Sequence, residues 1–234
     1  MSLFSLAGKV AVITGSTRGI GKAIAERMAE AGAKVVISSR KPEACAAVAA
    51  AINATRGAGR AIAIPANISS KDELGHLVDE TTRQLGQIDI LVCNAASNPY
   101  FGPMAGIEDG QFRKILENNV LANHWLIGFV APQMLERKDG SIIIVSSIGG
   151  LRGSPVLGAY CVSKAADLQM ARNLAVEYGP GNVRSFNASG SSQSARAKSV
   201  LIRPGAMQLT RTLCGPYSQA RLRASCMSAA LEIA

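Results

Sequence analysis

A tyrosine and a lysine stand four residues apart in the stretch GAYCVSKAADLQMARNLAVEYGP (158–180). On a helix, residues four apart share one face, so the Lys164 ammonium would lie beside the Tyr160 ring. A free tyrosine keeps its proton up to about pH 10, and a neighbouring cation favours the phenolate. The pair therefore has the chemistry of a proton donor and the cation that tunes it. The alternative is an ordinary exposed pair on a helix surface.

A glycine-rich loop, ITGSTRGIG (13–21), separates the first apolar run from the first helical pattern. Gly15, Gly19 and Gly21 allow backbone angles closed to other residues and let a ligand approach the backbone. The helix that follows offers free N–H groups and the positive end of its dipole to a pyrophosphate. In this strand–loop–helix setting the loop predicts a dinucleotide site, and a purely structural turn is the alternative.

Two arginines indicate which dinucleotide binds. A carboxylate at the end of the second strand would bind the ribose hydroxyls of NAD and repel a 2′-phosphate. This chain has Ser39 and Arg40 there instead of an acid, and Arg18 lies in the glycine loop. Guanidinium groups suit phosphate, so we expect NADPH or NADP as the cofactor, with NADH or NAD as the alternative.

Short β-branched runs alternate with longer helical patterns, and this alternation predicts how these residues are positioned. Near-continuous apolar strands between helices are typical of a parallel sheet covered on both faces, with ligands at the carboxyl ends of the strands. We therefore expect a single α/β domain with a doubly wound parallel sheet of Rossmann type. The expected strands are 9–14, 33–39, 60–67, 88–95 and 141–147, and the expected helices are 19–32, 42–55, 70–86, 109–136 and 157–178.

The composition is that of a globular protein, with 234 residues of which 48% are hydrophobic and 18% charged. No apolar run reaches membrane-spanning length, and the N-terminus has no secretory signal pattern, so we expect a cytoplasmic protein without a membrane partner. The five cysteines form no CxxC pair, which favours reduced structural thiols. The two histidines have no metal-ligand spacing, so we expect no metal site.

Several motifs occur in order at matching spacings, and together they resemble the short-chain dehydrogenase/reductase (SDR) family over residues 6–184. The motifs are TGxxxGxG at 14–21, NAAS at 94–97, ENNV at 117–120, IVSSIGG at 144–150 and YCVSK at 160–164. The stretch NPYFG (98–102) is also similar to the NADP-dependent carbonyl reductase branch that contains dehydrogenase/reductase member 4. The resemblance implies an oxidoreductase that reduces a small ketone or aldehyde, or oxidises a secondary alcohol.

The resemblance also implies a role for each matching residue. In the family the serine holds the carbonyl oxygen, the asparagine joins a proton relay, and the lysine also holds the nicotinamide ribose. The implied catalytic residues are Asn119, Ser147, Tyr160 and Lys164. The implied cofactor-binding residues are Gly15, Thr17, Arg18, Gly19, Ile20, Gly21, Ser39, Arg40, Asn67, Ile68, Asn94, Ala95, Tyr160 and Lys164. Family members pair through the helices expected at 109–136 and 157–178, so a homodimer or homotetramer is implied.

The end of the chain departs from the family pattern after Arg184. A sixth strand is not recognisable, and a Pro-Gly turn comes late, at 204–205. Residues 181–234 carry seven Lys and Arg against one acid. We therefore divide the chain into a dinucleotide-binding domain, 1–184, and an atypical basic segment, 185–234. The segment is either that of a divergent, shortened family member or the product of a shifted reading frame.

This departure leaves a second function open. If the segment does not complete the substrate pocket, the chain binds the cofactor with weak turnover or none. A basic segment also suits nucleic acid, but no nucleic-acid module accompanies it, so we expect no such partner.

Overall fold

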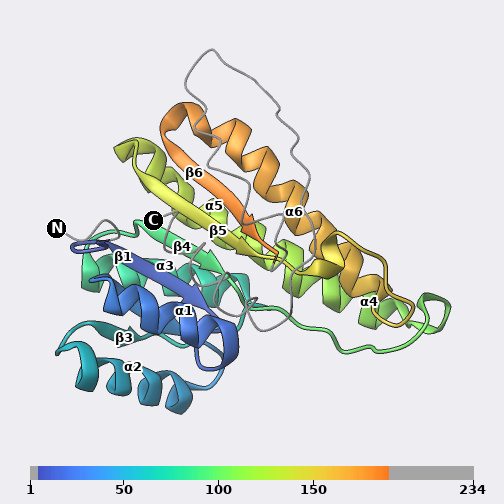
Figure 1. Cartoon of the computed structure of the whole chain (residues 1–234), viewed down its shortest axis with the longest axis horizontal. Coiled ribbons are helices and arrows are strands. Elements are labelled where there is room, and N and C mark those ends of the chain that lie inside the picture. Colours follow the sequence, from blue (N-terminus) through green and yellow to red (C-terminus); the bar gives the residue numbers. More distant parts are fainter. Residues whose placement is uncertain (1–4, 190–234) are drawn as a thin grey trace, which may run out of the picture.

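Six short runs of the chain pair in parallel to form one sheet in the computed structural model, which describes residues 5–189. The strands are β1 (Val10–Thr14), β2 (Lys34–Ser38), β3 (Ala61–Ala63), β4 (Ile90–Cys93), β5 (Gly140–Val145) and β6 (Val183–Ala188). Their order is β3-β2-β1-β4-β5-β6, so the chain winds outward from β1 in both directions (Figure 1). The predicted doubly wound sheet of Rossmann type is confirmed.

Helices cover both faces of this sheet. The long ones are α1 (Gly19–Glu30), α2 (Pro42–Arg56), α3 (Lys71–Leu85), α4 (Asp109–Leu116), α5 (Ala122–Arg137) and α6 (Gly158–Tyr178). The short ones are η1 (Met104–Gly106), η2 (Glu117–Leu121), η3 (Ile148–Gly150) and η4 (Gly179–Gly181). One apolar cluster packs α1 and α2 against the sheet around Met28 and Ile37, and a second packs α3, α5 and α6 around Leu77 and Leu126. Two buried faces explain why β1 and β4 are buried along their whole length and why every residue in them except Thr14 is apolar.

The chain continues as a strand through Arg184, so the expectation that the sixth strand would be lost is wrong. β6 pairs in parallel with β5 in register along its whole length. The pairing uses backbone groups, so the serine and asparagine side chains that obscured the pattern do not prevent it. Val183 is buried, and Phe186 packs against the α1 and α2 cluster. The late Pro-Gly turn lies in 190–234, outside the described residues.

The helix expected over 109–136 is interrupted rather than continuous. One turn of π-helix, η2, joins α4 to α5. Asn118 and Asn119 are buried in this turn, and both hydrogen-bond Ser97 in the loop after β4. A π-helical turn inserts one extra residue into a helix and is frequent at functional sites. The helical period of the sequence continues across the turn, which is why a single helix was predicted.

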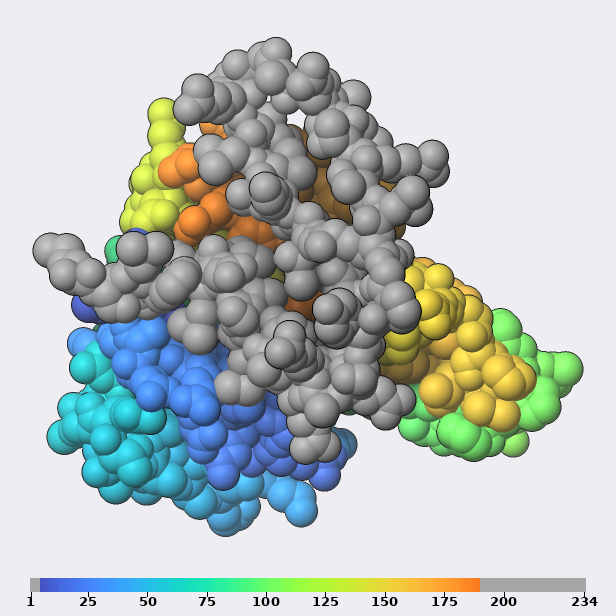
Figure 2. All heavy atoms as spheres, in the orientation of Figure 1, coloured from blue at the N-terminus to red at the C-terminus, as the bar shows by residue number. Residues whose placement is uncertain are grey.

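Two loops at the carboxyl edge of the sheet lie side by side at one end of the molecule (Figures 1 and 2). One runs from β4 to η1, and the other leads from η3 into α6. The Gly102 N–H donates to the Val156 carbonyl at 2.9 Å and joins the two loops. Met104 of η1 packs so closely on Gly158 that a Cβ there would clash with it. The two loops therefore form one rim beside the start of α6.

Within residues 5–189, no helix combines the length and the apolar character needed to cross a membrane. Cys45, Cys93 and Cys161 are free and buried, as expected of structural thiols. Cys214 and Cys226 lie outside the described residues.

One hydroxyl in β6 gives a stability prediction. The Ser185 hydroxyl is buried and has no hydrogen-bond partner among the described residues. Burying such a group costs about 1–3 kcal/mol, so Ser185→Ala is expected to raise the free energy of unfolding by about 1 kcal/mol. Ser16→Ala is the control, because the Ser16 hydroxyl donates to the Ile13 carbonyl at 2.7 Å. Denaturant unfolding of both variants checks this: Ser16→Ala should lose stability, and a loss in Ser185→Ala would contradict the prediction.

Candidate active site

The residues expected to bind the cofactor follow the carboxyl ends of neighbouring strands. Because the strands are parallel, these ends meet at one edge of the sheet. The glycine loop follows β1, Ser39 and Arg40 follow β2, Asn67 and Ile68 lie in the segment after β3, and Asn94 and Ala95 follow β4. Ligands of doubly wound sheets bind where the winding direction changes, which here is between β1 and β4. The structure therefore brings all these segments to the edge where a dinucleotide would lie.

Asn94 fastens the glycine loop to β4. Its side-chain amide donates to the Thr14 carbonyl at 2.9 Å and to the Gly15 carbonyl at 3.3 Å. In return, the Thr14 hydroxyl accepts from the backbone N–H groups of Asn94 and Ala95, at 3.0 and 3.1 Å. Gly15 and Gly19 have φ angles of 65° and 55°, which glycine adopts without strain. These hydrogen bonds thus fix the conformation of the loop against β4. The first turn of α1 follows directly at the end of the loop.

Gly21 is the loop position with the least room. A Cβ at this position would meet the Asn94 side-chain amide and lie 2.5 Å from the Gly15 carbonyl oxygen. We expect Gly21→Ala to cost about 1–3 kcal/mol through overpacking and to weaken cofactor binding, because the loop must shift. Gly75→Ala in α3 is the control, since a Cβ there makes only an ordinary contact, 3.7 Å from Phe129. The control should gain up to about 1 kcal/mol from helix propensity. Thermal unfolding with and without NADPH compares the Tm of the two variants. An equal Tm and an equal rise with NADPH in both variants would contradict the prediction.

The two arginines lie shortly after the ends of β1 and β2, as the sequence predicted. Arg18 is the N-cap residue of α1, and Arg40 follows β2 by two residues. Both are exposed, and neither forms an ion pair with another described residue. Ile20 is 61% exposed in the first turn of α1, while Thr17 and Ser39 are half-buried. This edge therefore combines unpaired cations with an apolar side chain that a bound ring can cover.

Asn67 shapes the turn between β3 and α3. Its N–H donates to the Glu73 carboxylate at 2.8 Å, and its Oδ1 accepts from the Ser69 N–H at 3.2 Å. Ile68 packs against the apolar cluster below it. The turn is thereby held in place, and the Asn67 Nδ2 group has no hydrogen-bond partner among the described residues, so it is available to a ligand.

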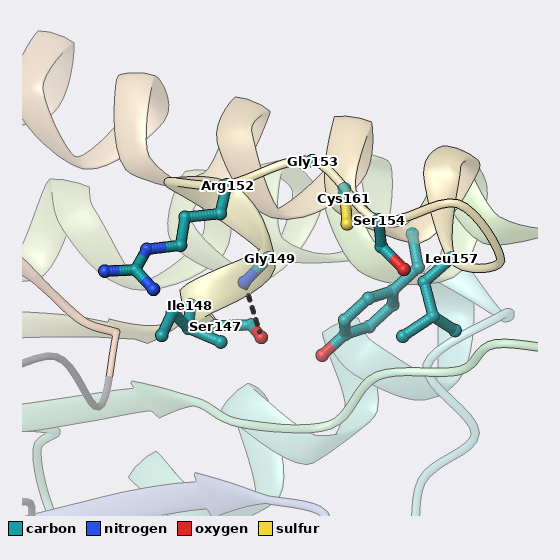
Figure 3. A pocket seen from close by; sticks show the side chains of 9 residues that line it. Ser147, Ile148, Gly149, Arg152, Gly153, Ser154, Leu157 and Cys161 are labelled. Atoms are coloured by element: carbon teal, nitrogen blue, oxygen red, sulfur yellow. Dashed lines mark hydrogen bonds between the residues drawn. The ribbon is translucent and has the colours of Figure 1, made fainter.

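Ser147 and Tyr160 line one cavity of about 290 Å³. Ser147 lies two residues past β5, and its Oγ accepts a hydrogen bond from the Gly149 N–H at 3.1 Å (Figure 3). This bond leaves the Ser147 hydroxyl proton free to donate into the cavity. Ile148 and Leu157 add apolar walls, and Arg152 adds a cation. The cavity can therefore hold a small, largely apolar molecule beside one serine and one tyrosine hydroxyl.

Lys164 lies beneath the Tyr160 ring and is almost fully buried, at 2% exposure. Its Nζ is 5.9 Å from the ring centroid, within the range of cation–π attraction. The ammonium donates to the Val145 carbonyl at 3.0 Å and to the Asp167 carboxylate at 2.8 Å. Burial raises the pKa of Asp167, while the Lys164 ammonium and the Asn123 amide oppose this rise. Tyr160 and Lys164 therefore meet on one face of α6, as their spacing predicted.

Asn119 lies in the π-helical turn and joins this group through Ser163. Its Nδ2 donates to the Ser163 hydroxyl and to the Ser97 carbonyl, both at 3.0 Å. The Ser163 hydroxyl in turn donates to the Tyr160 carbonyl at 2.7 Å. The structure thus links Asn119 to the helix turn that carries Tyr160 and Lys164, although it makes no direct hydrogen bond to Lys164.

Three residues of this network were not among those selected from the sequence: Asn123, Ser163 and Asp167. Asp167 had a signal, because an acid three residues after Lys164 falls on the same helix face. Asn123 and Ser163 had none, since their contacts depend on how α5 and the π-helical turn pack against α6.

Comparison with known proteins identifies the family. A family model described as short chain dehydrogenase matches residues 9–191. The chain is 42% identical over 180 residues to dehydrogenase/reductase SDR family member 4 of Rattus norvegicus, and 41% identical over the same length to that of Homo sapiens. These alignments cover 76% of this chain and 63% and 64% of the two relatives. The chain thus spans less than two thirds of the length of these curated relatives.

Solved structures agree with this match. A 7α-hydroxysteroid dehydrogenase in complex with NADH and 7-oxo glycochenodeoxycholic acid is 35% identical, with a TM-score of 0.75 over 80% of this chain and 71% of that chain. A short-chain type dehydrogenase/reductase from Mycobacterium marinum is 34% identical, with a TM-score of 0.75 over 80% of this chain and 76% of that chain. The sheet order, the glycine loop and these matches lead to one conclusion: the chain belongs to the short-chain dehydrogenase/reductase family of oxidoreductases.

Proposed function

We propose that this chain transfers hydride between NADPH and a small ketone, aldehyde or secondary alcohol. The observation that carries the proposal is the single cavity lined by Ser147 and Tyr160, with Lys164 buried beneath the tyrosine ring. No other pair of hydroxyls described above combines a shared cavity with a buried cation. NADH is the alternative cofactor, and it is named for the 35% identical hydroxysteroid dehydrogenase.

The residues at the sheet edge fit a nicotinamide dinucleotide. The crowding at Gly21 supports the proposal, because the third glycine of a dinucleotide-binding loop is the one that lets the helix pack closely on the strand. Arg18 and Arg40 are exposed and available to a 2′-phosphate. The Asn67 Nδ2 group has no hydrogen-bond partner within residues 5–189 and is available to the adenine, while its Oδ1 is held by the Ser69 N–H. When bound, the nicotinamide ring supplies or accepts the hydride.

The chain's own residues would bind the substrate oxygen and transfer a proton to it. The Ser147 hydroxyl donates to the carbonyl oxygen and holds it in the cavity. The Tyr160 hydroxyl gives its proton to that oxygen as negative charge develops there, which leaves a phenolate. The Lys164 ammonium stabilises this phenolate by its charge. In the alcohol-oxidising direction, the phenolate accepts the proton instead.

A second candidate function is cofactor binding without turnover. It is favoured by one observation, that the alignment with the Rattus norvegicus relative covers 76% of this chain and 63% of that relative. If the residues after the matched stretch do not complete the substrate pocket, water reaches the reacting carbonyl and turnover is weak.

Absorbance at 340 nm separates the two candidates. Purified protein is mixed with NADPH and a panel of small diketones and quinones, and the loss of the reduced cofactor is followed. Loss that depends on both protein and acceptor supports the oxidoreductase and removes the second candidate. Binding of NADPH without loss in any mixture supports the second candidate.

We further propose that two copies of the chain pair through α4, α5 and α6. Exposed apolar side chains on these elements support the pairing, including Phe129 on α5 and Val162 and Val176 on α6. Light scattering on the eluting protein measures the mass, and a monomer at micromolar concentration would contradict the proposal.

A further inference from the structure

Asp167 is a buried carboxylate in the helix that carries Tyr160 and Lys164, and the function proposed above does not use it. Its side chain is 0% exposed. The Oδ2 atom lies 2.8 Å from Lys164 Nζ, and the Oδ1 atom accepts a hydrogen bond from Asn123 Nδ2 at 3.0 Å. Asn123 itself is held by a second bond, to the Asn119 carbonyl at 2.7 Å. Both carboxylate oxygens therefore have a donor at a fixed position.

The Lys164 ammonium needs a counter-charge. At 2% exposure it has almost no contact with water, and burial favours the neutral amine over the charged form. Its other hydrogen-bond partner is the Val145 carbonyl, which carries no net charge. The Asp167 carboxylate is therefore the anion that compensates the buried cation.

The other ionisable groups around this pair do not supply the counter-charge of Lys164. The elements packed against α6, together with β4 and α5, carry Cys93, Asp109, Arg113, Lys114, Glu117, His124, Glu136, Arg137 and Arg184, and α6 itself also carries Tyr160, Cys161, Arg172, Glu177 and Tyr178. Burial raises the pKa of the Cys93 thiol, which stays neutral near pH 7. The charged groups among the others are exposed, so water and salt screen their effect on a buried ammonium. The exception is the half-buried Arg137, which lies at the far end of α5 and donates to the Ile88 carbonyl.

We propose that Asp167 is a positioning residue that keeps Lys164 charged and holds its ammonium beneath the Tyr160 ring. The inference rests on the proposed role of Tyr160 as the proton donor, since that role requires a cation beside the ring. Asn119 and Asn123 extend the arrangement, because they join the π-helical turn to the carboxylate that holds the lysine.

The test follows phenolate formation at Tyr160 by ultraviolet absorbance, which needs no turnover. The Tyr160 signal is the difference between the whole chain and its Tyr160→Phe variant, and the same subtraction is made in an Asp167→Asn background. This substitution keeps the shape of the side chain and an oxygen for Lys164 but removes the charge. We expect the midpoint of phenolate formation to move to higher pH by at least about one unit, because no opposite charge then holds the ammonium beneath the Tyr160 ring.

Two results would overturn the proposal. An unchanged midpoint means that Asp167 serves only the packing of α6. A midpoint at lower pH means that the carboxylate mainly cancels the field of Lys164 at Tyr160. A chain without oxidoreductase activity still gives a midpoint, so failure of the proposed function is distinguishable from failure of this inference.

Ser163→Ala is the matched control. It breaks the hydrogen bonds to Asn119 and to the Tyr160 carbonyl, one residue from Lys164, but it removes no charge. Its midpoint is expected to stay within about 0.3 units of the unchanged chain. A shift as large as that of Asp167→Asn would remove the charge of Asp167 as the cause and overturn the proposal.

If Asp167→Asn does not fold, the Lys164→Met/Asp167→Asn double variant decides, by circular dichroism and thermal unfolding. Removing one partner of a buried ion pair leaves an uncompensated charge, whereas removing both does not. A double variant that folds identifies the unpaired ammonium as the cause and supports the proposal. A double variant that also fails to fold assigns Asp167 a purely structural role and overturns it.

Discussion

Tyr160→Phe is expected to lower turnover by about 10²–10⁴-fold while NADPH binding stays within about twofold. The phenyl ring keeps the packing in the first turn of α6 and the position above Lys164, at 5.9 Å from ring centroid to Nζ. Only the hydroxyl is lost, and with it the proton, so the developing charge on the substrate oxygen is no longer neutralised. Steady-state rates at 340 nm and a fluorescence titration of NADPH measure the two effects separately.

Tyr178→Phe is the matched control for this substitution. Tyr178 lies at the other end of α6, is half-buried, and packs against the α3, α5 and α6 cluster away from the cavity. Its loss of a hydroxyl should leave turnover unchanged. Turnover of Tyr160→Phe equal to that of the unchanged chain would remove Tyr160 from the mechanism.

Arg40→Asp is expected to reverse the cofactor preference. Arg40 is exposed just past β2, where it would pair with a 2′-phosphate, and a carboxylate there would bind ribose hydroxyls instead. A hydrogen bond to a charged group contributes about 1.5–3 kcal/mol, so the NADPH dissociation constant should rise by about 10–100-fold. The NADH dissociation constant should stay equal or fall. Fluorescence titration with each cofactor measures both.

Arg172→Asp controls for the change in net charge. Arg172 is exposed on α6, and its guanidinium hydrogen-bonds only Gln169 among the described residues, at 3.4 Å. The Arg172→Asp substitution should change the NADPH and NADH dissociation constants only slightly and by equal factors. If Arg40→Asp behaves in the same way, Arg40 does not contact the 2′-phosphate and the preference for NADPH has another source.

The fold was predictable from the sequence because its signals are local. The run Val10–Thr14, followed by Gly15, reads as a buried strand entering a tight loop, and the structure has both. β3 is shorter than predicted over 60–67, although the Ile64 and Ala66 N–H groups beyond its end still donate to the Ile37 and Ser39 carbonyls. β6 was missed, since Ser185 and Asn187 hide its period and only its pairing with β5 defines it.

The candidate site was also predictable only in part. Tyr160 and Lys164 were predictable because four residues on a helix fix their common face. Asp167 shares that face three residues after Lys164, but the sequence does not say that this face of α6 is buried. The Val145 carbonyl was not predictable, because it comes from β5 and only the packing of α6 on β5 brings it to the ammonium.

Thermal unfolding of the purified chain without ligand, with NADH and with NADPH tests the central claim most directly. A cofactor at about a hundred times its dissociation constant stabilises the native state by about 2.7 kcal/mol. For a chain of this length, that raises the Tm by about 5–10 °C. The account predicts a rise of this size with NADPH and a smaller one with NADH at the same concentration. No rise with either cofactor would contradict the dinucleotide site at the edge of the sheet, and with it the proposed oxidoreductase.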